Sequence, residues 1–144
     1  MRAGRPVFAP NRAYAISEGY PMLCWLVVDD SDLIRKVARK VLEDMNYMVL
    51  EADSGESAIA QCTRAMPELI LLDWHMPGTS GHEVMAAIRN IPSEHRPVIV
   101  YCTTQNDPLD ISRAFANGAD AYMLKPFNRS ILKAKVAEAA LLAA

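Results

Sequence analysis

Five short, continuously apolar runs recur along this chain, and they constrain its fold more than any other feature. They cover residues 24–28, 48–50, 69–72, 98–101 and 121–124. A strand that is covered on one face alternates apolar and polar residues, whereas a strand covered on both faces is apolar throughout. The runs therefore predict five strands in the interior of a layered domain.

Segments with helical periodicity follow each of these runs. In residues 31–45, apolar side chains recur every three or four positions, and Asp30 or Ser31 can serve as the N-cap. Further helices are predicted over 55–64, 81–89, 108–117 and 128–142. Strands and helices that alternate in this way predict an α/β fold: a doubly wound, five-stranded parallel sheet with five flanking helices.

The size and composition of the chain suit a protein with a substantial core. Of its 144 residues, 51% are apolar, and the formal net charge is −2. These values exclude an intrinsically disordered chain and argue against a nucleic-acid clamp. No apolar run reaches the ~20 residues of a membrane span, and no signal-peptide core is present. The chain has three cysteines without Cys-x-x-Cys spacing, so we expect a cytoplasmic protein.

The beginning of the chain differs from the rest. Residues 1–21 contain three prolines and show neither helical nor strand periodicity. We predict an irregular N-terminal arm over 1–21 and a single domain over 22–144. An alternative is that translation begins at Met22, directly before the first apolar run.

Reactive side chains follow four of the five predicted strands: Asp29 and Asp30, then Asp73, then Thr103 and Thr104, then Lys125 before Pro126. Sites in open parallel sheets form at the carboxyl ends of the strands. Three carboxylates at one edge repel one another, and a hard cation such as Mg²⁺ relieves that repulsion. With a hydroxyl and a lysine nearby, the pattern indicates phosphoryl transfer, with a carboxylate as nucleophile.

The order and spacing of these residues resemble the receiver domains of two-component response regulators, and single-domain, chemotaxis-type receivers most of all. The resemblance covers about residues 22–143. It rests on Val-Val-Asp-Asp-Ser at 27–31, Leu-Leu-Asp-Trp-His-Met-Pro-Gly at 71–78, Gly81, Thr103, Gly-Ala at 118–119, and Tyr-Met-Leu-Lys-Pro-Phe at 122–127. It implies a flavodoxin-like sheet with strand order 2-1-3-4-5.

The resemblance also implies a phospho-acceptor and a metal site. Asp73 would be the phosphorylated aspartate and one of the Mg²⁺ ligands. Asp30 would bind Mg²⁺ directly, Asp29 would bind it through water, and the backbone carbonyl of His75 would be a further ligand.

Switch residues follow from the same resemblance. Thr103 would contact the phosphoryl oxygens, and Lys125 would pair first with Asp73 and then with the phosphoryl group. Tyr122 would turn inward as Thr103 moves. The peptide bond between Lys125 and Pro126 is often cis in such domains.

Three residues occupy positions that tune the lifetime of the phosphoryl group. His75 could block or orient the attacking water, or lie in solvent. Thr104 stands where the family usually has a smaller residue, so it could narrow access to Asp73 or replace Thr103. Gln105 is a neutral side chain at a third such position.

The implied partners are proteins. A histidine kinase or a histidine phosphotransfer protein would donate the phosphoryl group, and a downstream protein would bind the face formed by the fourth helix, fifth strand and fifth helix. The chain ends near the fifth helix, so we expect a single-domain regulator with no direct DNA binding and no membrane association. We expect a monomer, with dimerisation on activation as an alternative. The basic side chains on the first helix fit a solvated face or a kinase-docking surface: Arg35, Lys36, Arg39 and Lys40.

Two other functions share parts of this pattern. A pseudo-receiver would act as a binding module without phosphorylation. A phosphatase of the haloacid dehalogenase type also uses an aspartate, Mg²⁺ and a lysine, but it needs a second acid where this chain has His75. We therefore expect a switch rather than an enzyme, with only self-phosphorylation and autodephosphorylation chemistry. Cys24, Cys62 and Cys102 are predicted to be buried and inert, and His82 and His95 to lie on the surface.

Overall fold

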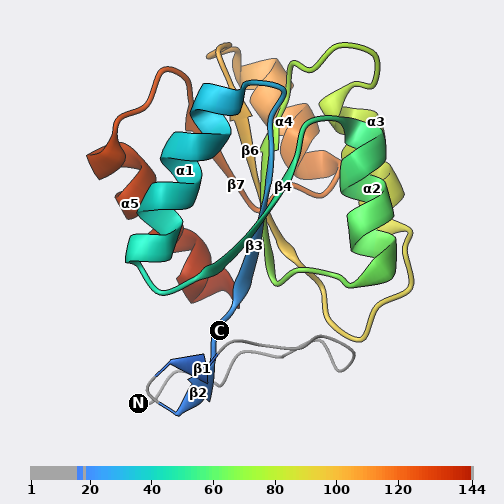
Figure 1. The fold of residues 1–144 in the computed structure, drawn as a ribbon. Helices are drawn as coiled ribbons and strands as arrows, with labels where there is room; N and C mark the ends of the chain where they lie inside the picture. Colours follow the sequence, from blue (N-terminus) through green and yellow to red (C-terminus); the bar gives the residue numbers. More distant parts are fainter. Residues whose placement is uncertain (1–15, 18, 144) are drawn as a thin grey trace.

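The computed structural model describes residues 16–17 and 19–143, and its main feature is one parallel sheet (Figure 1). The five strands are β3 (Cys24–Val28), β4 (Met48–Ala52), β5 (Leu69–Asp73), β6 (Val98–Thr103) and β7 (Ala121–Leu124). Their spatial order is β4-β3-β5-β6-β7. Numbered among themselves, the strands therefore have the order 2-1-3-4-5, which confirms the predicted doubly wound sheet.

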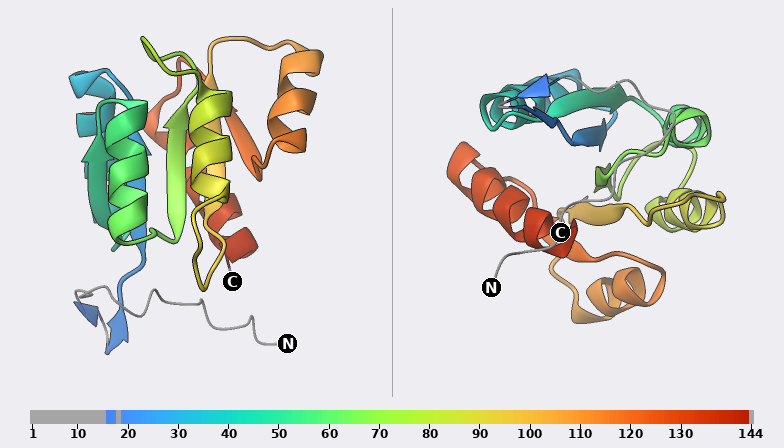
Figure 2. Two further views of the ribbon diagram at one scale, coloured as in Figure 1. Left: turned by 90° about the vertical axis from the view of Figure 1, so that its right-hand side faces the viewer. Right: turned by 90° about the horizontal axis from the view of Figure 1, so that it is seen from below.

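Five helices cover the two faces of this sheet: α1 (Asp32–Asp44), α2 (Gly55–Arg64), α3 (Gly81–Arg89), α4 (Pro108–Ala116) and α5 (Arg129–Ala143). Helices α1 and α5 pack together on one face, and α2, α3 and α4 lie on the other (Figures 1 and 2). Each helix begins and ends within one residue of its predicted range. Within the described part of the chain, no helix is long and apolar enough to cross a membrane.

The two faces of the sheet bury separate groups of side chains. Along β3, Leu26 and Val28 point toward α2, α3 and α4, whereas Trp25 and Val27 point toward α1 and α5. The central strands β3, β5 and β6 are buried at every position, which explains their continuously apolar sequences. The edge strands β4 and β7 are only half buried, so the prediction of five fully covered strands was wrong for these two.

Polar N-caps begin four of the helices near the carboxyl ends of the strands. Ser31 is the N-cap of α1, and its Oγ accepts a hydrogen bond from the Ile34 N–H at 3.3 Å. Ser54, Ser80 and Asp107 cap α2, α3 and α4 in the same way. These caps fix where each loop leaves the sheet, and they therefore help to position the side chains on those loops.

A short antiparallel ribbon precedes the sheet. Strand β1 (Ile16–Ser17) pairs with β2 (Tyr20–Pro21), and Gly19 between them has a φ of +82°. This ribbon differs from the irregular structure predicted for residues 1–21, because a glycine at positive φ permits a tight turn that periodicity does not reveal. The remainder of the predicted arm, residues 1–15 and 18, and the last residue of the predicted 22–144 domain lie outside the described residues.

Candidate functional site

Backbone hydrogen bonds just beyond the strands bring the predicted site residues to one edge of the sheet. The Asp29 N–H donates to the Ala52 carbonyl at 3.1 Å, and the Lys125 N–H donates to the Thr103 carbonyl at 2.8 Å. The Trp74 N–H donates to the carbonyl of the neighbouring β6 strand, also at 2.8 Å. The loops after β3, β5, β6 and β7 therefore leave the sheet side by side.

Three carboxylates meet at this edge. Asp29, Asp30 and Asp73 each offer one oxygen, and these oxygens lie within 4.8 Å of one another. Asp29 and Asp73 are each only 3% exposed, whereas Asp30 is open to solvent. Hard oxygen donors beside solvent match the preference of Mg²⁺, which keeps several of its water ligands. The residues present therefore fit a magnesium ion.

Lys125 joins two of these acids. Its Nζ lies 2.7 Å from Asp29 Oδ2 and 3.1 Å from Asp73 Oδ1, so it is shared between them rather than paired with Asp73 alone. Burial acts to lower the pKa of Lys125, but the hydrogen bond to Asp29 and the charge of Asp73 outweigh it and raise the pKa above its ordinary value. Lys125 therefore stays positively charged at neutral pH. The peptide bond that joins it to Pro126 is cis.

The environment of Asp73 disfavours its ionised form. Burial raises the pKa of Asp73, and the negative charge of Asp29 raises it further, while Lys125 and the His75 N–H act in the opposite direction. That N–H donates to Asp73 Oδ1 at 3.3 Å. Positive charge brought to the site would therefore favour the carboxylate, which is the form able to attack an electrophile.

The hydroxyl of Thr103 is held in place by two neighbours. Thr103 is 3% exposed, and its Oγ1 accepts a hydrogen bond from the Gln105 N–H at 3.1 Å. The Nε2 of His75 lies 3.2 Å from the same Oγ1. His75 therefore touches the predicted switch hydroxyl, a contact that its position in the sequence does not reveal. The side chains of Thr104 and Gln105 are exposed.

Trp74 forms an aromatic wall next to Asp73. Its ring centroid lies 5.0 Å from that of Tyr101 and 3.9 Å from that of His82. A Cβ on Gly81 would lie 2.4 Å from Trp74 Cε3, so only glycine fits beneath the ring. His82 lies at the surface as predicted, but this ring covers it in part, and burial lowers the pKa of His82.

Tyr122, the predicted aromatic switch residue, belongs to the same group of rings. It is partly buried and lies 6.0 Å from Tyr101 and 6.3 Å from Phe115, measured between ring centroids. Tyr101 is therefore in contact with both Trp74 and Tyr122. These rings connect β5, β6, β7 and α4.

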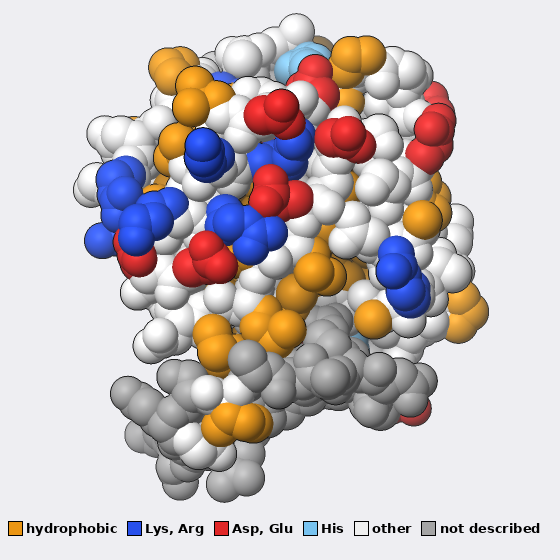
Figure 3. All heavy atoms as spheres, viewed as in Figure 1, with side chains coloured by type: hydrophobic (Ala, Val, Ile, Leu, Met, Phe, Trp, Pro, Cys, Tyr) orange, Lys and Arg blue, Asp and Glu red, His pale blue; other side chains and the backbone are white. Residues whose placement is uncertain are grey.

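The side chains of α1 differ from the fully solvated stripe that was one of the two predictions. Arg35 is only 12% exposed, whereas Lys40 is 66% exposed. Basic and acidic side chains alternate over this part of the surface in Figure 3 rather than forming a purely basic patch. Arg35 also donates to the carbonyl of Asp29. The spacing of Asp32 and Arg35 indicates an ion pair between them. No sequence signal points to the second acidic partner of Arg35, which is Glu51 on β4.

His95 lies away from this edge, near the opposite ends of the strands. It was predicted on the surface, but its side chain is 6% exposed and its Nε2 lies 3.2 Å from the Pro67 carbonyl. His95 itself belongs to the loop between α3 and β6, and the packing of a loop side chain against the residue Pro67 leaves no periodic signal in a sequence.

Comparison with known proteins agrees with this geometry. A family model described as the response regulator receiver domain matches residues 25–137. The transcriptional regulatory protein ResD of Bacillus subtilis (strain 168) is 42% identical over 103 residues, which are 72% of this chain and 42% of ResD. The phosphate regulon transcriptional regulatory protein PhoB of Escherichia coli (strain K12) is 34% identical over 111 residues, which are 77% of this chain and 48% of PhoB. The chain thus spans less than half the length of these two relatives.

Solved structures extend the comparison to three dimensions. The chemotaxis response regulator CheY4 of Vibrio cholerae superimposes with a TM-score of 0.78 at 31% identity, and the match covers 82% of this chain and 98% of CheY4. The family-model match over residues 25–137 includes the five strands of the parallel sheet, apart from the first residue of β3, and the acidic edge described above. On the family match, the relatives and the fold together, the chain belongs to the response regulator receiver domain family.

Proposed function

We propose that this chain is a phosphorylation-dependent switch in which Asp73 accepts a phosphoryl group from a phosphohistidine. The donor would be a histidine kinase or a histidine phosphotransfer protein. The observation that carries the proposal is the position of Lys125 Nζ, which lies 2.7 Å from the buried carboxylate of Asp29 and 3.1 Å from that of Asp73. This arrangement supports Asp73 as nucleophile with a fixed positive charge beside it.

The proposed transfer is a displacement at phosphorus. An oxygen of Asp73 attacks, the new O–P bond forms, and the N–P bond to the imidazole breaks. The electrons of the N–P bond stay on that nitrogen, and the other ring nitrogen carries a proton, so the leaving group is a neutral imidazole. Lys125 offsets negative charge on the phosphoryl oxygens.

A magnesium site at the acidic edge is part of the proposal. Asp29, Asp30, Asp73 and the carbonyl of His75 would hold a Mg²⁺ ion, which when bound neutralises charge on the transferring oxygens. The three carboxylates would otherwise disfavour the approach of a phosphoryl dianion.

Switching would begin at Thr103. Its hydroxyl would leave His75 and contact the phosphoryl oxygens, and Tyr122 would adjust within its aromatic group. The face made by α4, β7 and α5 would then change its affinity for a downstream protein. Exposed apolar side chains on this face support such binding, since Leu109 is 68% exposed and Ile131 is 47% exposed.

The first test uses Trp74 as a reporter. Beryllofluoride imitates a phosphoryl group on a carboxylate, so titration should give a saturable, Mg²⁺-dependent change in fluorescence. The change should vanish in Asp73→Asn, which also corrects for the background from Trp25. Absence of both this response and Mg²⁺ binding would favour a pseudo-receiver. Turnover of a small phosphate ester would instead indicate a phosphatase.

The second test concerns Lys125. The Lys125→Ala variant should still take up phosphate from acetyl phosphate but should fail to change its affinity for a partner. A phosphorylated Lys125→Ala protein that binds its partner as the wild type does would refute this role for the lysine.

The proposed kinase contact lies beside the acidic edge. An apolar groove of about 400 Å³ is lined by Leu33, Ile34, Val37, Thr104, Lys125, Pro126 and Phe127. Leu33 is 71% exposed, and such an apolar side chain next to Lys125 suits a helix that carries the phosphohistidine.

Paired substitutions test this contact. Leu33→Arg should slow phosphoryl transfer about tenfold, measured with a phosphorylated kinase that is active on the wild type. Transfer from acetyl phosphate should not change. Leu141→Arg is the matched control, because Leu141 is equally exposed, at 76%, but lies on α5 outside the groove. Equal transfer rates for both variants would exclude the groove as the docking site.

A further inference from the structure

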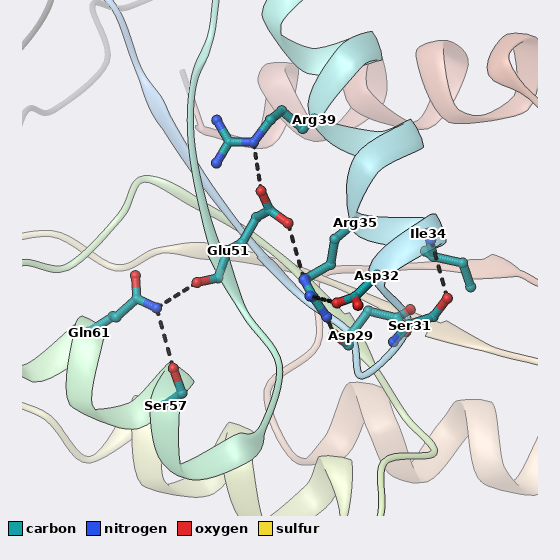
Figure 4. Close-up of polar contacts among 9 residues, drawn as sticks. All are labelled: Asp29, Ser31, Asp32, Ile34, Arg35, Arg39, Glu51, Ser57 and Gln61. Carbon is teal, nitrogen blue, oxygen red and sulfur yellow. Dashed lines mark hydrogen bonds and ion pairs between the residues drawn. The ribbon is translucent and has the colours of Figure 1, made fainter.

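Arg35 lies on α1, and its guanidinium extends to the loop that carries Asp29 and Asp30 (Figure 4). Its Nη1 donates to the backbone carbonyl of Asp29 at 2.6 Å, and its Nε donates to Glu51 Oε1 at 3.1 Å. A third contact joins Arg35 to Asp32. The Arg35 side chain is only 12% exposed, so its bonds to Asp29 and Glu51 are partly sheltered from water, whereas Asp32 is 93% exposed.

Glu51 on β4, which accepts a hydrogen bond from Arg35, is itself held by two further contacts. Its Oε2 accepts a hydrogen bond from Arg39 Nε at 2.6 Å, and its backbone carbonyl accepts one from the side chain of Gln61 on α2 at 2.7 Å (Figure 4). Burial acts to raise the pKa of Glu51, but the hydrogen bonds from Arg39 and Arg35 outweigh it and hold the pKa below its ordinary value. The glutamate is therefore an anion at neutral pH, and the guanidinium of Arg35 has a fixed counter-charge.

The carbonyl that Arg35 holds belongs to the peptide unit between Asp29 and Asp30. The rest of Asp29 is also fixed, since its N–H donates to Ala52 and its Oδ1 accepts from the Ser31 N–H at 2.9 Å. A change in the ψ angle of Asp29 would swing this carbonyl away from Arg35 and would move the Cα of Asp30. Because Asp30 is exposed, its placement depends on the backbone more than on side-chain packing.

A positive charge close to a cation site would normally weaken cation binding. Here Arg35 contacts two acids, Asp32 and Glu51, which neutralise it. The arginine can therefore act as a rigid hydrogen-bond donor without opposing the cation. Its planar guanidinium donates to three acceptors at once in a fixed geometry, which a lysine ammonium on a flexible chain cannot match.

We infer that Arg35 is a positioning residue for the divalent cation: by holding the Asp29 carbonyl, it sets the orientation of the peptide unit that presents Asp29 and Asp30. This inference rests on the proposed function, because it takes the acidic cluster to be the cation site.

A titration with Mg²⁺ alone, followed by the fluorescence of Trp74, tests the inference. Arg35→Met should raise the dissociation constant for Mg²⁺ about three- to tenfold, because part of the free energy of one hydrogen bond from a charged donor is lost to cation binding. Arg39→Met is the matched control, because it also loses an ion pair with Glu51 but does not contact Asp29. Its dissociation constant should stay within about twofold of the wild-type value.

The same variants separate positioning from general stabilisation. Both should lower the melting temperature, but only Arg35→Met should need more Mg²⁺ for phosphorylation by acetyl phosphate. At saturating Mg²⁺ its rate should return to about the wild-type rate. Arg35→Lys serves if Arg35→Met does not fold, because the lysine can keep the pair with Glu51 while losing the carbonyl contact. It too should bind Mg²⁺ more weakly.

Two results would overturn the inference, and they are distinguishable. Wild-type affinity for Mg²⁺ in the folded Arg35 variants, or equal weakening in Arg39→Met, would show that Arg35 does not position the site. Failure of the wild-type protein itself to bind Mg²⁺ would instead remove the proposed function and, with it, the inference.

Discussion

His75 holds the hydroxyl that the proposed switch must move. Its Nε2 lies 3.2 Å from Thr103 Oγ1, and its backbone N–H donates to Asp73. One residue thus contacts both the proposed phospho-acceptor and the proposed switch hydroxyl. A side chain that stabilises Thr103 in this position opposes the movement toward a phosphoryl group, so His75 should bias the switch toward its resting state.

Removal of this contact should favour the active state. His75→Ala should bind beryllofluoride about fivefold more tightly, because about 1 kcal/mol of hydrogen bonding no longer holds Thr103. Titration followed by Trp74 fluorescence measures the change. Gln105→Ala is the control, since Gln105 contacts Thr103 only through its backbone N–H and should bind as the wild type does. Unchanged or weaker binding by His75→Ala would contradict the bias.

Gly81 is the residue where a single methyl group should disturb the site. Its Cβ would lie 2.4 Å from Trp74 Cε3, so Gly81→Ala must displace the ring. We expect a loss of about 1–3 kcal/mol in the free energy of unfolding and a shifted Trp emission, both measurable in urea titrations. Gly78→Ala should also cost stability, through its φ of +90°, but should leave the emission unchanged because its Cβ would have open space. A shift in emission for both variants would mean that the ring responds to the loop and not to the close approach.

At the scale of elements, the helices and strands could be predicted closely because their signals are local. The range of α2 follows from Gly55 at its start and from Pro67, which lies shortly after its end. The central strands follow from uninterrupted apolar runs. The position of the candidate site could be predicted too, because parallel topology brings the carboxyl ends of the strands to one edge independently of side-chain conformation. The contacts of Arg35 with Glu51 and of His75 with Thr103 could not be predicted, since each depends on side-chain conformation across sequence separations of 16 and 28 residues.

The ion pairs between α1 and β4 should make stability depend on pH. The pKa of Glu51 lies below its ordinary value of 4.5 in the folded chain, so its contribution is present above that value and is lost as the pH falls through the folded-state pKa. Glu51→Gln should therefore be less stable than the wild type at pH 7 by about 1 kcal/mol.

The difference should shrink as the pH falls through the folded-state pKa of Glu51, because the carboxyl is then protonated in folded and unfolded chains alike. Denaturant unfolding at several pH values measures it. Glu43→Gln provides a comparison, because Glu43 is 52% exposed and pairs with Arg39 at 3.4 Å, so its effect should be smaller at every pH. A difference that persists unchanged at low pH would mean that Glu51 acts through packing rather than charge.

At the scale of the whole molecule, helices cover both faces of the sheet, so reactive side chains in the core have little access to solvent. All three cysteines are buried, and burial raises the pKa of Cys102 to about 12. The predicted inert role of the cysteines therefore has a structural basis, since a thiol reagent attacks the thiolate and needs access to it.

The native protein should resist thiol modification as a unit. At pH 8, the three cysteines should react with a disulfide reagent only as fast as the domain unfolds, and all three should react at once in denaturant. A cysteine introduced at Leu141, which is 76% exposed, should react immediately and serves as the positive control. One rapidly modified native cysteine would show that part of the core opens independently.

The sharing of Lys125 between Asp29 and Asp73 has a consequence that can be stated as a charge balance. With all carboxylates ionised, the three acids and the lysine carry a net charge of −2, which one bound dication would cancel. In the proposed switch, phosphorylation would replace the single charge of Asp73 with about two, so a site that is electroneutral with the dication bound would become anionic. The added negative charge would favour hydrogen-bond donors close to the phosphoryl oxygens, and the hydroxyl of Thr103 is a buried donor at the same edge of the sheet.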